Sequence, residues 1–310
     1  MSSKQWVNLF FIGISTLVIM TLISSFFIHN KFPENSLRKK EYLIKDNTPK
    51  IIFAGDSRAE RQLSVSTALN KLSYSKGDIV NVATSSGDPI ALNHLVDKYP
   101  NKFKNATVFV SMSANQLNDS ARTRGYFTNS MISKLSYTEQ IMTFIPNNIR
   151  TLAGYYYSVI RPYSTEAGEF RNTYGFNPID GTLQKKHITA GSIKRNEWYK
   201  NYADKGLKYD LISTSLSDLT NKVGKLYVYT APFAPSYLSA MEKHNVLNFE
   251  RLFKTRIMDI CYKNNITCIN YLKINELNDS HFYDGAHTNK NGAKIFTKKV
   301  LKDFGLTLIQ

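Results

Sequence analysis

The sequence has few of the residues that build metal centres. Only two of its 310 residues are cysteine, Cys261 and Cys268, and only six are histidine. None of them shows the spacing of a zinc site, and the glycines form no phosphate-binding loop. We therefore expect neither a metal nor any other cofactor.

Acidic residues are also scarce. The chain has 24 Asp and Glu against 40 Lys and Arg, which gives a net charge of +16. This excess favours an anionic partner, such as an acidic glycan, a teichoic acid or a lipid phosphate. The alternative is a lysine-rich surface that is merely solvated. No internal repeat or low-complexity tract is present, and the length allows one large domain or two small ones.

Only one hydrophobic run is long, and it extends from Trp6 to Ile28 without a charged residue. At ~1.5 Å per residue, a helix of this length can cross a bilayer core of ~30 Å. A cleaved signal peptide has a shorter apolar region and a small-residue cleavage site, so residues 1–28 are predicted to be an uncleaved membrane anchor. Basic residues after the run favour a cytoplasmic domain, although long domains cross membranes largely regardless of this bias.

Apolar runs and helical stretches alternate from residue 50 onward, after a polar stalk at 29–49. Strands are expected at 50–55, 79–83, 107–112, 225–230 and 267–271, and helices at 59–72, 90–98, 210–222, 249–264 and 291–304. The alternation predicts a three-layer α/β domain over 50–310, with a five-stranded parallel sheet between two layers of helices. Right-handed crossovers then bring the carboxyl ends of the strands to one edge.

Residues 118–208 interrupt this alternation, and an unstructured loop of that length would be unusual. We expect an inserted helical cap over the sheet edge. Its last part interleaves aromatic and basic residues, among them Trp198 and Tyr199. These two are candidate substrate contacts, because aromatic rings stack on sugars while Lys and Arg hold phosphate or carboxylate groups. The alternative is that the aromatic residues pack the cap onto the domain.

The two cysteines leave two outcomes open. Cys261 falls near the end of a predicted helix and Cys268 in the strand that follows it, so the pair can come within disulfide distance. A disulfide would fit an oxidising compartment. Two free buried thiols are the alternative.

A turn with a serine follows the first predicted strand. The apolar run breaks at Gly55, and Ser57 then lies between a strand and a helix, at the edge where open α/β sheets bind ligands. The N–H groups of the new helix favour negative charge there, which suits a serine that attacks a carbonyl. A plain helix N-cap is the alternative role. Asp56 is expected to shape the turn through hydrogen bonds.

A second group, near the end of the chain, favours the catalytic role. Asp284 and His287 lie in a turn after the last strand, just before the final helix. An Asp three residues before a His can bond one imidazole nitrogen, which fixes the tautomer and raises the basicity of the ring. The other nitrogen is then free to take the proton of the serine.

Donors for an oxyanion hole, which stabilises charge on a carbonyl oxygen, follow the next two strands. Gly87 can present a bare backbone N–H, and Asn115 a side-chain amide. The N–H of Ser57 is the third donor. Ser86 can replace Gly87 in this role.

These blocks resemble the SGNH hydrolase superfamily, also called GDSL esterases. They occur in the family's order, each just after a predicted strand: Gly55-Asp56-Ser57, Gly87, Asn115 and Asp284-x-x-His287. The resemblance covers about 50–304 apart from the cap, and it implies a flavodoxin-like sheet. It also implies that Ser57 is the nucleophile and that His287 is the base, oriented by Asp284. The implied oxyanion hole consists of Ser57, Gly87 and Asn115.

The sequence departs from the family pattern in two blocks. The third block usually reads Gly-x-Asn-Asp, but here it reads Ser113-Ala114-Asn115-Gln116. In the second block, the glycine is offset by about one residue from its usual position. No Gly-x-Ser-x-Gly elbow is present, which disfavours an ordinary α/β-hydrolase. Three further residues are weaker candidates for substrate contact: Ser86, Arg58 and His281.

The resemblance implies serine-dependent acyl chemistry. The first hypothesis is a membrane-anchored esterase that removes O-acyl groups, above all O-acetyl, from a cell-envelope carbohydrate. The second is an acyltransferase of the O-acetyl or D-alanyl type that modifies an envelope polysaccharide or teichoic acid. The third is a non-catalytic envelope protein that binds polyanions. In each case we expect the domain outside the cytoplasm, in the periplasm or at the cell surface, and no nucleic-acid partner, because an envelope polymer accounts for the charge.

Overall fold

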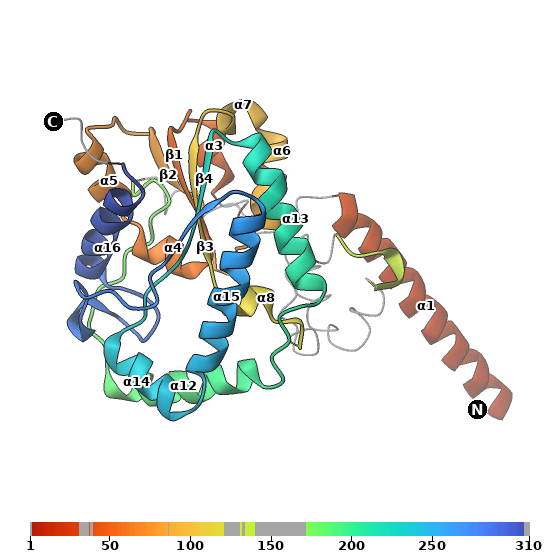
Figure 1. The fold of residues 1–310 in the computed structure, drawn as a ribbon. Helices are drawn as coiled ribbons and strands as arrows, with labels where there is room; N and C mark the ends of the chain where they lie inside the picture. Colours follow the sequence, from red (N-terminus) through yellow and green to blue (C-terminus); the bar gives the residue numbers. More distant parts are fainter. Residues whose placement is uncertain are drawn as a thin grey trace.

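A computed structural model describes residues 2–30, 37, 40–85, 87–120, 131, 134–139 and 172–306. Its sheet has five strands: β1 (Ile51–Gly55), β2 (Ile79–Asn81), β3 (Thr107–Met112), β4 (Lys225–Thr230) and β5 (Thr267–Asn270). Neighbouring strands are all parallel, in the order β2-β1-β3-β4-β5 (Figure 1). The predicted five-stranded parallel sheet is confirmed. Its order is flavodoxin-like, and the winding reverses between β1 and β3, where such folds bind ligands.

An aromatic row holds the three central strands in register. Phe53, Phe109 and Tyr227 are aligned partners in β1, β3 and β4. Their ring centroids are 5.7 and 5.0 Å apart along the row. Phe304, which follows the last helix, lies 4.4 Å from Tyr227 and closes the row. Tilted and edge-on ring contacts add to the stabilisation from burial, so a register slip would break several of them together.

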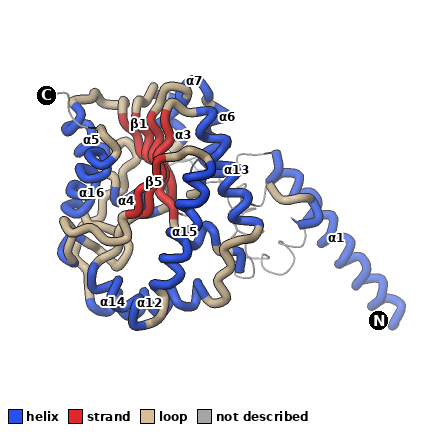
Figure 2. The backbone as a smooth tube through the Cα atoms, in the orientation of Figure 1, coloured by secondary structure: helices blue, strands red, loops and turns tan. Residues whose placement is uncertain are grey.

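Helices cover both faces of the sheet (Figure 2). One layer contains α4 (Ser57–Gln62), α5 (Val65–Leu72) and α16 (Lys290–Asp303), and the other contains α6 (Pro89–Lys98), α7 (Pro100–Phe103), α13 (Leu207–Lys222) and α15 (Leu247–Lys263). The helices predicted at 90–98, 210–222, 249–264 and 291–304 are present with ends shifted by up to three residues. Apolar periodicity thus located these helices but not their exact caps.

The helix predicted at 59–72 is wrong as a single element. The first helix ends at Gln62, and the second begins after Ser64, whose hydroxyl accepts the N–H of Thr67 at 3.3 Å. The N–H of Ser64 donates to Thr297 of α16 at 2.8 Å. A serine in a helical pattern can offer the backbone this alternative hydrogen bond, so the chain turns here and restarts.

Two helices lie side by side near the carboxyl edge of the sheet: α12 (Lys185–Tyr199) and α14 (Pro235–Lys243) (Figure 1). The sequence did not predict α14. α12 belongs to the cap expected at 118–208, of which the structure describes 118–120, 131, 134–139 and 172–208. The aromatic residues of the cap at 126, 127, 155–157, 163 and 170 lie outside the described residues.

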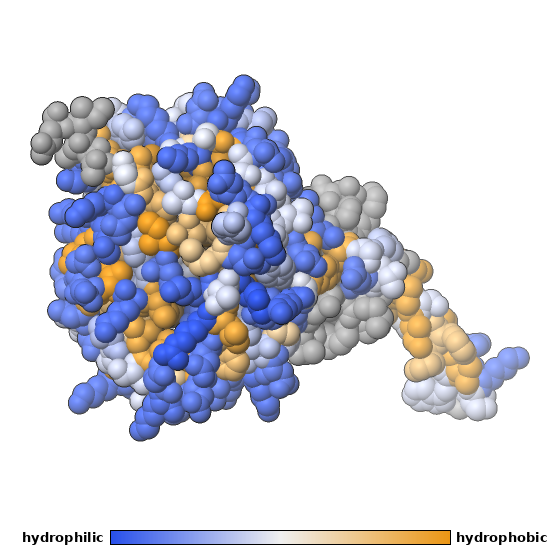
Figure 3. All heavy atoms as spheres, in the orientation of Figure 1, coloured by the Kyte–Doolittle hydropathy of each residue, from blue (hydrophilic) through white to orange (hydrophobic). Residues whose placement is uncertain are grey.

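The apolar N-terminal run forms α1 (Ser3–Asn30). Within it, Ser3–Met20 has a mean hydropathy of 1.2 and is not buried, so it is long and apolar enough to cross a membrane. Figure 3 shows its apolar side chains exposed, apart from the body of the domain. This agrees with a membrane-spanning segment, and the retention of the helix as an anchor stays a prediction. The direction in which the chain crosses stays a prediction.

Part of the expected stalk packs into the domain. α3 (Glu41–Lys45) buries Leu43 and Ile44 against the core. Lys40 is 1% exposed. Its ammonium group donates to the carbonyl of Ala83 at 2.6 Å, and it pairs with Glu60 at 3.0 Å. Residues 40–45 are therefore packed with the domain that was expected to begin at 50.

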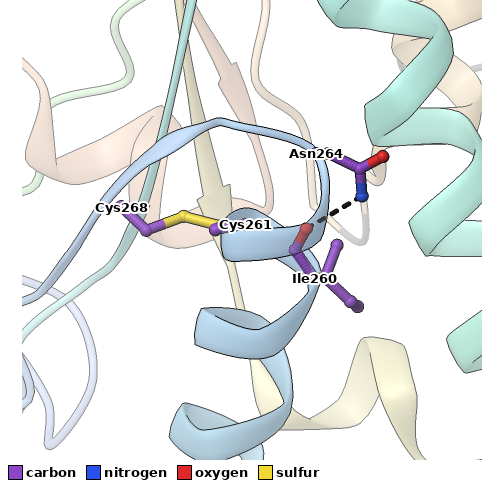
Figure 4. The surroundings of a disulfide bond; sticks show 4 residues. All are labelled: Ile260, Cys261, Asn264 and Cys268. Carbon is purple, nitrogen blue, oxygen red and sulfur yellow. Dashed lines mark hydrogen bonds between the residues drawn. A yellow bond between two sulfur atoms is a disulfide. The ribbon is translucent and has the colours of Figure 1, made fainter.

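The two cysteines are joined by a disulfide (Figure 4). Cys261 lies in the last turns of α15 and Cys268 in β5, with 6.2 Å between their Cα atoms. Asn264, in the turn between them, donates its side-chain amide to the carbonyl of Ile260 at 2.8 Å. Of the two outcomes that the sequence left open, the structure therefore shows the disulfide, which ties the edge strand to the helix before it.

Candidate active site

The end of β1 positions Ser57. Gly55 has a φ of 117°, and a side chain there would overlap the backbone of Ser111 in β3. Only glycine adopts this conformation readily, so the chain can leave the sheet here in a sharp turn. Asp56 caps the new helix by accepting the N–H of Arg58 at 3.1 Å, and it also accepts the hydroxyl of Ser111. Asp56 thus shapes the turn, as expected, and Ser57 becomes the first residue of α4.

Three side chains form a continuous hydrogen-bonded series. The hydroxyl of Ser57 lies 2.9 Å from Nε2 of His287, and Nδ1 of His287 lies 2.9 Å from a carboxylate oxygen of Asp284. The other carboxylate oxygen accepts the backbone N–H groups of Ala286 and His287, each at 2.8 Å. The amide of Gln62 in α4 donates to the carbonyl of Ala286 at 2.7 Å, which fixes the histidine loop to the helix that carries the serine.

The carboxyl group of Asp284 stays ionised far below neutral pH. Burial by itself would raise its pKa, but hydrogen bonds from the His287 ring and from two backbone N–H groups lower the pKa to about 2. A carboxylate that accepts several N–H groups has its charged form stabilised. Asp284 can therefore hold the imidazole tautomer in which Nδ1 carries the proton and Nε2 faces the serine.

The lowered pKa makes a pH-dependent contribution to stability. A carboxyl group whose pKa falls from 3.8 unfolded to about 2 folded stabilises the protein fully above pH 3.8, and less as the pH falls through about 2. We expect Asp284→Asn to lower the free energy of unfolding by about 1–2 kcal/mol at neutral pH, a value reduced because the side chain is 30% exposed. Urea unfolding should show the deficit shrinking between about pH 4 and pH 2.

Asp180→Asn is the matched control, because this carboxylate is 75% exposed and its partner is Lys290 at the surface. Its deficit should be close to zero throughout. A deficit in Asp284→Asn that stays constant down to the lowest pH would contradict the proposed source of the stabilisation.

Two donors face the same cavity as the serine. Asn115 lies in α8 (Ala114–Leu117), a short helix that is held by a capping box between Ser113 and Gln116. Both Asn115 and Ser57 line the cavity. Within the described ranges, neither the side-chain amide of Asn115 nor the backbone N–H of Ser57 has a hydrogen-bond partner. These donors remain available to an oxygen atom of a bound ligand.

The structure does not bring Gly87 into this set. Its N–H donates to the carbonyl of Thr84 at 2.9 Å, and its own carbonyl accepts the amide of Gln116 at 2.6 Å. A side chain at Gly87 would overlap the carbonyl of Gly55, so glycine is required here for close packing. Gly87 does not line the cavity. The alternative donor, Ser86, lies outside the described residues, so its role stays a prediction.

The cavity has a volume of about 600 Å³, within the range of small-molecule sites. Its floor comes from the turns after β1 and β3, one side from the histidine loop, and the roof from α12. The lining residues are Asp56, Ser57, Arg58, Ser113, Asn115, Gln116, Met131, His187, Ala190, Gly191, Lys194, Arg195, Trp198, Tyr237, Tyr283, Asp284, Gly285, Ala286 and His287. In the part of the chain that is described, no group of three or more His, Cys, Asp or Glu could hold a metal ion.

Of the weaker sequence candidates, Trp198 and Arg58 reach the cavity, whereas Tyr199 and His281 do not. Arg58 is 4% exposed, and its guanidinium donates to the carbonyl of Met112 at 2.8 Å, so it supports the floor. His281 accepts the N–H of Asn278 at 3.1 Å and thereby caps the short helix η2 (Asp279–His281).

Tyr199 belongs to a buried cluster behind the roof. Arg195 donates to the carboxylate of Glu250 at 3.0 Å and to the hydroxyl of Tyr237 at 3.2 Å. Tyr199, fully buried, donates to the same carboxylate at 2.6 Å. Burial works against the charge of Arg195, but its tyrosine and glutamate neighbours raise its pKa above the ordinary value. The cluster fixes α12 over the cavity, and the sequence missed it because its members come from three separate helices.

The fold and this geometry define an α/β protein with a Ser–His–Asp arrangement at the carboxyl edge of its sheet. No protein-family model matches the sequence, and no curated protein matches it. Among solved structures, it is similar to a Streptococcus pneumonia protein named as a platelet activating factor, with 12% identity, a TM-score of 0.39, and coverage of 94% of this chain and 98% of that one. It is also similar to a catalytic mutant of an acetylxylan esterase from Geobacillus stearothermophilus, with 10% identity, a TM-score of 0.38, and coverage of 84% and 95%. Because both TM-scores are low, the fold class is assigned from the order and direction of the strands alone.

Proposed function

We propose that this protein is a serine-dependent acyl hydrolase. The observation that supports this most strongly is the unbroken series from Asp284 through His287 to the hydroxyl of Ser57, with both links near 2.9 Å. In the proposed reaction, Nε2 of His287 takes the proton as Ser57 attacks the ester carbonyl. The oxyanion that forms is held by the Ser57 N–H and the Asn115 amide. The protonated His287 then gives its proton to the leaving alkoxide.

The second half of the proposed reaction frees the enzyme. His287 takes a proton from water, the resulting hydroxide attacks the acyl-enzyme, and the carboxylic acid leaves as Ser57 regains its proton. Asp284 remains ionised and stabilises the imidazolium in both halves. A non-catalytic protein would have no need for a serine, an imidazole and a carboxylate held in this order, so the polyanion-binding alternative is disfavoured.

The proposed substrate is a carbohydrate that carries small O-acyl groups, above all O-acetyl. Aromatic side chains line the cavity beside hydroxyl and amide groups, the mixture that sugars require. Acyl transfer to a sugar hydroxyl would use the same three residues. One observation favours transfer as a second candidate. α12 covers the cavity as a roof, and a covered site can exclude the water that would otherwise take the acyl group.

We also propose that the domain lies outside the cytoplasm and is held by α1. The disulfide between Cys261 and Cys268 supports this location, since such bonds persist in oxidising compartments. α1 supplies a segment of sufficient length to hold the chain at a membrane. An acylated envelope polymer would then be within reach of the cavity.

The test uses cells that express the full chain and an acetylated oligosaccharide that cannot cross their membrane. We expect acetate to appear in the medium without permeabilisation. Adding an unacetylated oligosaccharide distinguishes the two reactions, because free acetate supports hydrolysis and a newly acetylated acceptor supports transfer. If neither product forms, even after permeabilisation and with a chromogenic acetyl ester, the proposed acyl chemistry is wrong. Activity only after permeabilisation would contradict the proposed location.

A further inference from the structure

Lys194 differs from the other charged residues around the cavity. Asp56 is paired with Arg58 and Arg195 with Glu250, and Asp284 is hydrogen-bonded to the ring of His287. Across the described part of the chain, Lys194 forms no ion pair or hydrogen bond. Its ammonium group lies 5.3 Å from the ring centre of Trp198. Lys194 therefore brings a positive charge to the cavity wall that pairs with no carboxylate among the described residues.

Trp198 is a fixed partner for this lysine. The two residues are four positions apart in α12, so they share one face of the helix. The backbone carbonyl of Trp198 accepts the amide of Asn118 at 3.2 Å, and the guanidinium of Arg195 lies 5.9 Å from its ring. The first contact fixes the backbone at Trp198 and the second places Arg195 beside the indole, which lines the cavity and offers apolar surface there.

The cavity extends well beyond the space that an acyl group needs. Its roof runs along α12 from His187 in the first turn to Trp198 in the last. At a rise of ~1.5 Å per residue this is about 16 Å. The ring of Tyr283 lies 6.4 Å from that of His187, so each end of the roof has an aromatic contact. A chain of sugars can lie under α12 with only one of its units at the serine.

We propose that Lys194 and Trp198 form a subsite for an anionic sugar unit beside the acylated one. The sugar ring contacts the indole of Trp198, and its carboxylate or phosphodiester pairs with the ammonium of Lys194. This inference rests on the proposed function and adds the substrate class, which is acylated anionic carbohydrate. The net charge of +16 helps to attract such a polymer, whereas Lys194 supplies the local recognition.

Binding to the full chain in neutral detergent, with Ser57→Ala to prevent turnover, tests the subsite separately from catalysis. The probes are sugar oligomers of matched length: one with carboxylates, one with phosphodiesters and one neutral. By titration calorimetry, at least one anionic probe should bind more tightly than the neutral one. Lys194→Gln should weaken that binding about fivefold and change the neutral probe by less than about twofold. Trp198→Leu should weaken every probe.

Lys186→Gln is the matched control, since this lysine is exposed on the same helix but does not line the cavity. It should change each dissociation constant by less than about twofold, and about 0.5 M NaCl should remove most of the Lys194 effect. Equal losses in the two glutamine variants would mean that total charge alone attracts the polymer, which would overturn the subsite. The subsite would also be overturned if both anionic probes bound no better than the neutral one, whether or not the wild-type chain hydrolyses esters.

Discussion

Ser57→Ala should lower kcat/KM for a chromogenic acetyl ester by about 10⁴-fold or more. Removing a serine nucleophile abolishes the covalent route, and the activity that remains comes only from binding and oxyanion stabilisation. The hydroxyl in question lies 2.9 Å from the imidazole of His287, so its loss also removes the proton donor of the first step. Initial rates of the purified full chain, with and without the substitution, give the comparison directly.

Two further variants show whether the effect belongs to the Ser–His pair. Ser239→Ala changes an exposed serine on α14 whose hydroxyl donates to the carbonyl of Pro235 in the same helix, so it should keep full activity. The double variant Ser57→Ala/His287→Ala should be no slower than Ser57→Ala, because residues that act as one unit do not contribute additively. Near wild-type activity in Ser57→Ala would rule out the nucleophile. Additive losses would mean that His287 acts outside the proposed unit.

The sequence could predict the parts of this site that depend on short stretches of chain. A buried strand followed by Gly55 predicts a turn, and the turn predicts where Ser57 lies. Asp284 and His287 are three residues apart, so their contact is also local. Parallel strands with helical crossovers leave their carboxyl ends at one edge, and this topology brings the serine and the histidine together across 230 positions.

The parts that the sequence could not predict depend on contacts between distant segments. Gly87 appeared to offer a free N–H, but Gln116 from a later helix holds its carbonyl, and its N–H closes a turn with the carbonyl of Thr84. Tyr199 resembled a sugar platform, yet its hydroxyl meets Glu250 from another helix. Lys40 belonged to a polar stretch that was expected outside the domain. In each case the sequence showed the type of residue but not the group that it contacts in the folded chain.

Replacing Lys40 is expected to destabilise the fold strongly. Its three donors meet the carbonyls of Ala83 and Gly175, at 2.6 and 2.7 Å, and the carboxylate of Glu60 at 3.0 Å. Glu60 lies one turn after Ser57 in α4, and its side chain is only 7% exposed. Lys40→Met would leave this carboxylate and two carbonyls buried without their donor. Removing one member of a buried pair costs about 3–5 kcal/mol, so we expect a loss of that size in the free energy of unfolding.

The loss of stability should come from the Glu60 carboxylate that is left unpaired, and not from the missing charge of Lys40. Burial lowers the pKa of Lys40 despite the nearby Glu60, which indicates that the protein holds this ammonium at a cost. The double variant Lys40→Met/Glu60→Gln should therefore recover part of the loss, because no carboxylate is then left unpaired. Urea unfolding, followed by the fluorescence of Trp198 in a Trp6→Phe background, measures each variant in the full chain.

Lys50→Met is the control, because Lys50 pairs with Asp78 at the surface and its side chain is 59% exposed. Exposed pairs are worth about 0–1 kcal/mol, so this variant should lose little. A Lys40→Met chain as stable as Lys50→Met would contradict the role given to the buried pair. If the Lys40 variant is destabilised as expected, the chain just before β1 is part of the support for the helix that carries Ser57. A soluble version of the domain would then have to begin before residue 40.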